Sequence, residues 1–80
     1  MTIETQVISE IAIALEIDKR SISIETDNSD IPEWDSLGHI SILVRLDLIF
    51  NDISERVPDI AAAASVREIV KLITNDLEKR

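Results

Sequence analysis

The sequence of 80 residues contains no cysteine, one glycine, two prolines and only two aromatic residues, Trp34 and Phe50. Without cysteine the chain can form neither a disulfide framework nor a thiolate metal site, so any thiol chemistry needs a sulfur supplied from outside the chain. The scarcity of aromatic residues leaves an aliphatic core, for which the chain has fifteen isoleucines and seven leucines. We therefore expect packed helices around aliphatic side chains.

Positive charge is also scarce, since 8 Lys+Arg stand against 16 Asp+Glu and the net charge is −8. This balance disfavours a nucleic acid or an anionic membrane as a partner and favours a basic protein surface. No apolar run approaches the roughly 18 residues of a membrane span, and the first residues lack the pattern of a signal peptide. We expect one monomeric domain over residues 1–80, located in the cytoplasm.

Apolar residues at helical spacing predict a first helix over residues 2–17, with Thr2 as its N-cap. Residues 18–35 lose this period and are dense in turn-forming residues, so they predict a long loop. Loops of this length in small domains are usually functional. Ile22, Ile24 and Ile31 are expected to attach the loop to the helices.

Three further helices are predicted after the loop. One begins at Asp35 or Ser36 and ends near Phe50, and a short one runs over residues 58–63. The last begins after Ser65, whose spacing to Glu68 is that of a capping box. The fold class is therefore all-α, a four-helix bundle with a short third helix and a long loop between the first two helices.

The helix predicted over residues 36–50 has two apolar stripes instead of one. The expected core stripe consists of Ile42, Leu43, Leu46, Ile49 and Phe50; the second stripe consists of Leu37, Ile40, Val44 and Leu48. Such a helix is either wedged between neighbouring helices or exposes its second stripe to a partner protein. The sequence leaves both alternatives open.

Ser36 stands at the start of this helix, directly after the acidic loop. One interpretation is that Ser36 only caps the helix. The other is that its hydroxyl is a site of covalent modification, because a phosphodiester there would meet free backbone N–H groups and the positive end of the helix dipole.

The segment Trp34-Asp35-Ser36-Leu37-Gly38-His39-Ile40 contains an Asp-Ser-Leu motif. It resembles the attachment motif of the acyl carrier proteins and related phosphopantetheine-binding carrier domains. The resemblance extends over the whole chain: a long first helix, a long loop, a helix headed by the motif, a short third segment and a capped last helix. It implies a bundle of the acyl-carrier type.

The resemblance also implies a carrier and not an enzyme. In that family the serine at the position of Ser36 accepts 4′-phosphopantetheine from coenzyme A through a separate phosphopantetheinyl transferase. The thiol of this arm then holds an acyl or aminoacyl group as a thioester, which fits a chain without cysteine. The expected partners are the transferase and the enzymes that load and transfer acyl or aminoacyl groups.

The resemblance further implies that Asp35 and Leu37 contact the transferase and that Ile40 and Val44 contact partner enzymes. We add Leu48 from the second stripe and Asp47, the one acid of this helix after Asp35. Carriers of fatty-acid synthesis have more acids along this helix, whereas here the acids gather in the loop and after Phe50. We therefore expect partners from a specialised biosynthetic pathway.

Other interpretations are weaker. Ser36, His39 and Asp35 invite the hypothesis of a hydrolase with a catalytic triad, but no nucleophile elbow is present and the chain has little room for a substrate cleft. The acidic loop lacks the spacing of a calcium-binding EF-hand, and we expect no metal site. Trp34 is expected to anchor the end of the loop, and Arg45 to pair with a nearby acid. The alternative function is that of an unmodified helical protein-interaction module.

Overall fold

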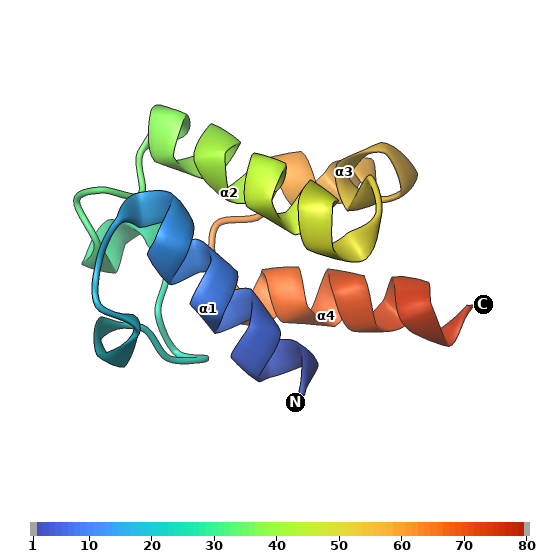
Figure 1. The fold of residues 1–80 in the computed structure, drawn as a ribbon, viewed down its shortest axis with the longest axis horizontal. Coiled ribbons are helices and arrows are strands. Elements are labelled where there is room, and N and C mark those ends of the chain that lie inside the picture. Colours follow the sequence, from blue (N-terminus) through green and yellow to red (C-terminus); the bar gives the residue numbers. More distant parts are fainter. Residues whose placement is uncertain (1, 80) are drawn as a thin grey trace.

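The computed structural model describes residues 2–79, which form four α-helices and three short 3₁₀ helices (Figure 1). The α-helices are α1 (Ile3–Leu15), α2 (Ser36–Phe50), α3 (Ile53–Arg56) and α4 (Val66–Glu78). The 3₁₀ helices are η1 (Lys19–Ser21), η2 (Asn28–Asp30) and η3 (Pro58–Ala62). The all-α bundle predicted from the sequence is confirmed, and the described residues contain no β-strand.

α1 begins where the sequence predicts and ends earlier. The hydroxyl oxygen of Thr2 accepts a hydrogen bond from the Thr5 amide at 3.1 Å, so the predicted N-cap is confirmed. Glu16 adopts a left-handed conformation (φ 57°), and the Ile17 amide donates to the Ala12 carbonyl at 3.1 Å. This closing turn satisfies the last carbonyls of the helix, so α1 ends at Leu15 and not at residue 17.

The predicted third segment is only part of what the structure contains. η3 corresponds to the predicted helix over residues 58–63, but one more helical turn, α3, precedes it. The Asp47 carboxylate holds the start of α3, because it accepts hydrogen bonds from the amide and the hydroxyl of Ser54, both at 2.8 Å. The cap comes from seven residues earlier in the chain, so local spacing gave no sign of it.

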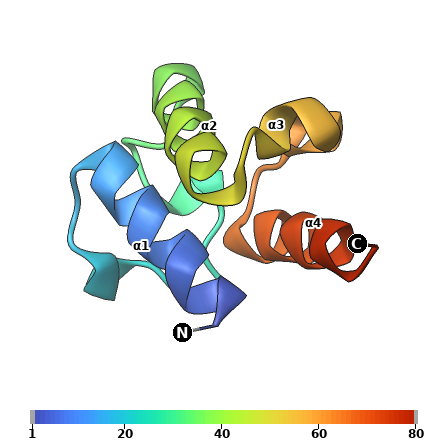
Figure 2. The same cartoon turned by 45° about the vertical axis from the view of Figure 1, so that its right-hand side comes forward.

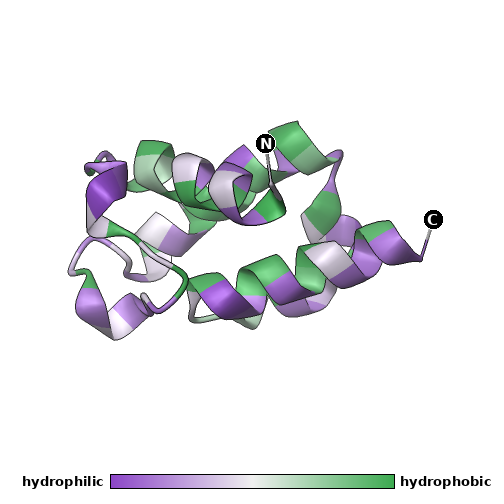
Figure 3. Ribbon diagram, turned by 90° about the horizontal axis from the view of Figure 1, so that it is seen from below, coloured by the Kyte–Doolittle hydropathy of each residue, from purple (hydrophilic) through white to green (hydrophobic). Residues whose placement is uncertain are grey.

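α4 starts with the predicted cap in a modified form. The Ser65 hydroxyl accepts a hydrogen bond from the Glu68 amide at 3.1 Å. The Glu68 carboxylate accepts from the Ala64 amide instead of the Ser65 amide, also at 3.1 Å. Ser65 also forms an isolated antiparallel bridge with Asp27, which joins the long loop to the start of α4. Figure 3 shows hydrophobic and hydrophilic residues in alternating bands along α4.

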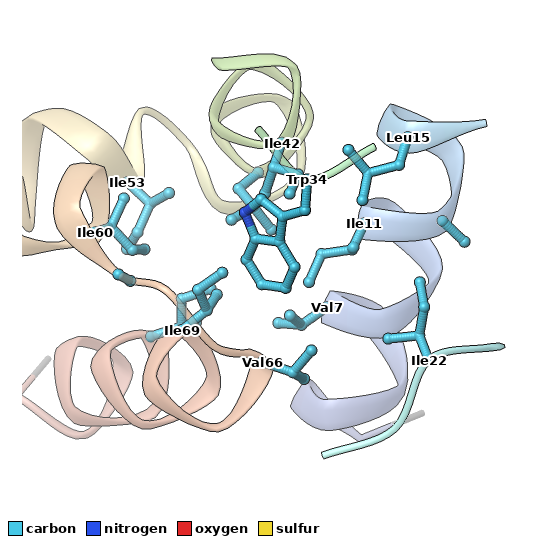
Figure 4. Close-up of a cluster of buried hydrophobic side chains, with 14 of the residues drawn as sticks. Val7, Ile11, Leu15, Ile22, Trp34, Ile42, Ile53, Ile60, Val66 and Ile69 are labelled. Atoms are coloured by element: carbon cyan, nitrogen blue, oxygen red, sulfur yellow. The ribbon is translucent and has the colours of Figure 1, made fainter. Parts of the chain in front are cut away.

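The core is aliphatic around one aromatic side chain. α1 packs against α2 and α4, while α3 and η3 pack against α2 (Figure 2). Trp34 is 4% exposed, and Figure 4 shows its indole inside a cluster of side chains from α1, α2, α4 and the loop. Ile22 and Ile31 are buried and Ile24 is partly buried against the same core. The predicted anchoring of the loop by Trp34 and these isoleucines is confirmed.

Within residues 2–79, no helix has the length and apolar character needed to cross a membrane.

Candidate functional site

Ser36 is the first residue of α2, and its side chain is exposed. The cap of the helix is Asp35, whose carboxylate accepts a hydrogen bond from the Gly38 amide at 2.8 Å. Of the two start positions that the sequence allowed, the structure selects Ser36 as the first helical residue. The interpretation of Ser36 as the N-cap is therefore wrong, and its hydroxyl is free of that role.

Ser36 lines an open groove of ≈ 610 Å³ between the start of α2 and η3. The α2 side of this groove includes Ile40 and Leu43, and the opposite side consists of residues 61–64. Those residues are four consecutive alanines, whose small side chains leave space beside α2. The groove was not predicted; the run of alanines was the only sign of it in the sequence.

Gly38 allows the loop to cross α2 directly beside Ser36. Gly38 is buried, and a Cβ atom placed on it would overlap the Glu33 carbonyl oxygen and lie 2.9 Å from Leu15 Cδ2. Any larger residue at this position would push the loop or α1 away. The only glycine of the chain thus fixes the position of the loop end that leads into Ser36.

His39 is not arranged to act as a base for Ser36. Its Nδ1 atom accepts a hydrogen bond from the indole N–H of Trp34 at 3.0 Å, and its Nε2 atom lies 3.0 Å from the Ile60 carbonyl oxygen. Both ring nitrogens are engaged by these partners, so neither is directed to the Ser36 hydroxyl. The geometry gives no support to the hydrolase hypothesis.

The second apolar stripe of α2 is exposed. Leu37 is 75% exposed and Leu48 69% exposed, and Ile40 and Val44 are each 56% exposed. The interpretation of α2 as a wedged helix is therefore wrong. Ile49, which was expected on the core stripe, is 46% exposed because it lies at the edge of the buried face formed by Ile42, Leu46 and Phe50.

α1 extends this apolar surface. Ile13 is 52% exposed and, with Ile40 and Val44, lines a shallow groove between α1 and α2. Arg45 also lines this groove and joins the two helices by an ion pair, in which Arg45 Nη2 lies 2.8 Å from Glu10 Oε1. The expected pairing of Arg45 with an acid is confirmed. The contribution of Ile13 was not predicted, because Ile13 lies outside the core stripe of the first helix.

The acids near the site already have structural partners. The half-buried Asp47 carboxylate binds Ser54, so Asp47 caps α3 as well as lying near the predicted docking surface. In the loop, the Ser29 hydroxyl and amide donate to the Asp27 carboxylate and hold its pKa below the ordinary value. Among residues 2–79, no three side chains of His, Asp or Glu gather in a way that could hold a metal ion.

Comparison with known protein families, with curated proteins and with solved structures finds no match for this chain.

Proposed function

We propose that this protein is a carrier that holds acyl or aminoacyl groups as thioesters on a 4′-phosphopantetheine arm attached to Ser36. The observation that carries the proposal is the exposed hydroxyl of Ser36 at the first position of α2, within an Asp-Ser-Leu motif and at the edge of a groove. The resemblance of the motif to that of carrier proteins gives the chemical identity of the arm.

The residues around Ser36 fit a phosphate-linked group. Asp35 satisfies the Gly38 amide, while the Ser36 and Leu37 amides lie in the first turn of α2, where a helix has no internal acceptors. These amides and the positive end of the helix dipole favour a phosphodiester on the Ser36 oxygen. Such a site needs no dedicated basic side chain.

The groove fits a flexible arm with apolar cargo. Ile40, Leu43 and the alanines at residues 61–64 give it apolar surface, and Asn28, Asp35 and His39 add polar groups. When bound, the arm supplies the thiol that the sequence lacks. The protein itself contributes a fixed attachment point, a surface that partners recognise and space along α2.

Attachment requires a separate enzyme, because no base is directed to Ser36. The bond formed joins Ser36 Oγ to phosphorus, and the bond broken lies within the pyrophosphate of coenzyme A. The adenine nucleotide is the leaving group, and the hydroxyl proton passes to the phosphopantetheinyl transferase. The carrier acts as substrate in this step and is not itself an enzyme.

The exposed stripe of α2 supplies the proposed docking surface. Leu37 and Asp35 flank Ser36, and Ile40, Val44 and Leu48 continue along the helix. Partners would be the transferase and the loading and transferring enzymes of a specialised pathway in the cytoplasm, with basic residues around an apolar contact. A monomer leaves this surface accessible, and neither nucleic acid nor membrane is a proposed partner.

The proposal is tested by intact mass after incubation with coenzyme A and a broad-specificity phosphopantetheinyl transferase. We expect one addition of about 340 Da. Ser36→Ala should abolish the addition. Ser41→Ala, which removes another exposed serine of the same helix, should leave it unchanged.

A folded protein that gains no mass would contradict the carrier function. That outcome, together with the exposed α2 stripe, would favour the alternative of an unmodified helical interaction module. An addition that persists in Ser36→Ala would contradict the assignment of Ser36.

A further inference from the structure

His39, the only histidine, connects three segments beside Ser36. It belongs to α2, Trp34 belongs to the end of the long loop, and Ile60 belongs to η3. The Trp34 and His39 rings are nearly parallel, with an interplanar angle of 10° and centroids 6.1 Å apart. This orientation lets the indole N–H point at His39 Nδ1, at 3.0 Å, while Nε2 lies 3.0 Å from the Ile60 carbonyl oxygen.

These two partners determine the protonation state of the ring. An indole N–H can only donate a hydrogen bond, and a carbonyl oxygen can only accept one. Nδ1 must therefore be without a proton, and Nε2 must carry one. The connection between the loop and η3 requires the neutral imidazole in its Nε2–H tautomer.

Protonation would place a second N–H on the ring, directed at the indole N–H. Two donors then face each other, so the bond to Trp34 is lost while the bond to Ile60 persists. Trp34 is 4% exposed, and a buried indole N–H without an acceptor is unfavourable. Trp34 and His39 both line the open groove beside Ser36, so a shift of the loop end toward the groove would bring the indole N–H to water.

The surrounding charges do not replace this bond. The loop contributes Glu33 and Asp35, η3 contributes Asp59, and the nearest charged residue on α2 is Arg45, which pairs with Glu10. The side chains of Glu33, Asp35 and Asp59 are exposed. In the structure the hydrogen bonds of the Trp34 indole and the His39 ring join these two side chains to each other and to the Ile60 carbonyl, and none of them goes to these carboxylates.

We propose that His39 is a pH-sensitive connection. In neutral form it joins Trp34 to η3 across the start of α2, and its protonation releases Trp34 and loosens the loop that leads into Ser36. Any effect of this change on the loading of Ser36 rests on the proposed carrier function, whereas the hydrogen bonds of His39 do not depend on that function.

Nitrogen-15 NMR of the full chain tests the proposal directly, because the sequence has one imidazole and one indole. At about pH 8 we expect the Nε2–H tautomer and an indole N–H protected from exchange with solvent. On acidification to about pH 5, with exchange rates corrected for their intrinsic pH dependence, protection of the indole N–H should fall at least about tenfold. This loss should follow the titration of the ring. An Nδ1–H tautomer, or indole protection that is unchanged across the titration, would overturn the proposal.

Two substitutions of His39 distinguish the role of its hydrogen bond with Trp34 from the role of its hydrogen bond with Ile60. His39→Asn keeps an acceptor near the position of Nδ1, and His39→Gln keeps a donor near the position of Nε2. We expect indole protection to survive in His39→Asn and to be lost in His39→Gln, with no titration between about pH 8 and pH 5 in either. If indole protection in His39→Gln still changes with pH, the pH dependence must come from the nearby carboxylates and not from His39. That result would contradict the proposal.

A measurement of Ser36 modification distinguishes this proposal from the carrier function. If the NMR titration is as expected but Ser36 is never modified, the connection stands and the carrier function fails. If Ser36 is modified but the indole does not respond to the ring, the carrier function stands and the connection fails. The NMR result decides the proposal with the unmodified wild-type protein alone, even where a variant does not fold.

Discussion

At the scale of single residues, Gly38 decides how closely the loop can approach α2. Replacing a helical glycine by alanine normally stabilises a helix by about 1 kcal/mol. Here the added methyl group would overlap a backbone carbonyl, that of Glu33, which cannot rotate away as a side chain would. We therefore expect Gly38→Ala to lower the free energy of unfolding by about 1–3 kcal/mol.

Urea denaturation followed by circular dichroism measures this change, with Asn75→Ala as control. Asn75 is an exposed residue of α4, so alanine there should leave stability unchanged or slightly higher. A Gly38→Ala protein as stable as the wild type would show that the loop end does not lie against α2.

Asp27 makes the contribution of the loop to the stability of the fold depend on pH. Hydrogen bonds from Ser29 lower the pKa of Asp27 in the folded protein below its ordinary value of 3.8. A carboxylate with a lowered pKa stabilises the fold above its unfolded pKa, and this contribution is lost as the pH falls through the folded pKa. Asp27→Asn should therefore be less stable than the wild type at about pH 7 and equally stable in strong acid. Urea denaturation across this range measures the difference, and a constant difference would contradict the assignment.

At the scale of elements, the apolar stripe of α2 is available for partners without a cost in stability. Leu48 is 69% exposed, so Leu48→Glu should change the free energy of unfolding by less than about 0.5 kcal/mol. If the stripe is the docking surface, the same substitution should slow transferase-dependent loading several-fold, because it places a charge in an apolar contact.

Loading rates measured by mass spectrometry test this, with Asn75→Glu as control. That variant adds the same charge to an exposed position on α4, away from the stripe. Equal loading rates in Leu48→Glu and Asn75→Glu would exclude the stripe as a docking surface.

The elements that the sequence predicted well are those with local signals. Thr2 and Ser65 mark the starts of α1 and α4, since a cap acts on amides within three residues. α3 was missed because its cap, Asp47, belongs to the preceding helix. The hydrogen bond between His39 and Ile60 was missed for the same reason, since the Ile60 carbonyl is 21 residues away. Ser36 could be singled out from its motif; its groove depends on how η3 packs against α2.

At the scale of the whole molecule, the net charge of −8 opposes folding. The structure contains four ion pairs among residues 2–79, and acids are twice as numerous as bases in the sequence. Self-repulsion of like charges therefore outweighs these pairs, and salt should screen it. We expect the Tm to rise when NaCl is raised from about 20 mM to about 200 mM, as measured by differential scanning calorimetry. A fall in Tm would mean that the ion pairs dominate.

If Ser36 carries a thiol-bearing arm loaded with cargo, as we propose, the arm and its cargo should be present on the protein isolated from its own cells. The measurement is the mass of the tryptic peptide 21–45, with fragmentation to locate the addition, before and after treatment with hydroxylamine. We expect an addition of about 340 Da or more on Ser36, which hydroxylamine reduces to the mass of the arm by cleaving the thioester. A peptide that bears no addition on Ser36, whatever the treatment, would contradict it.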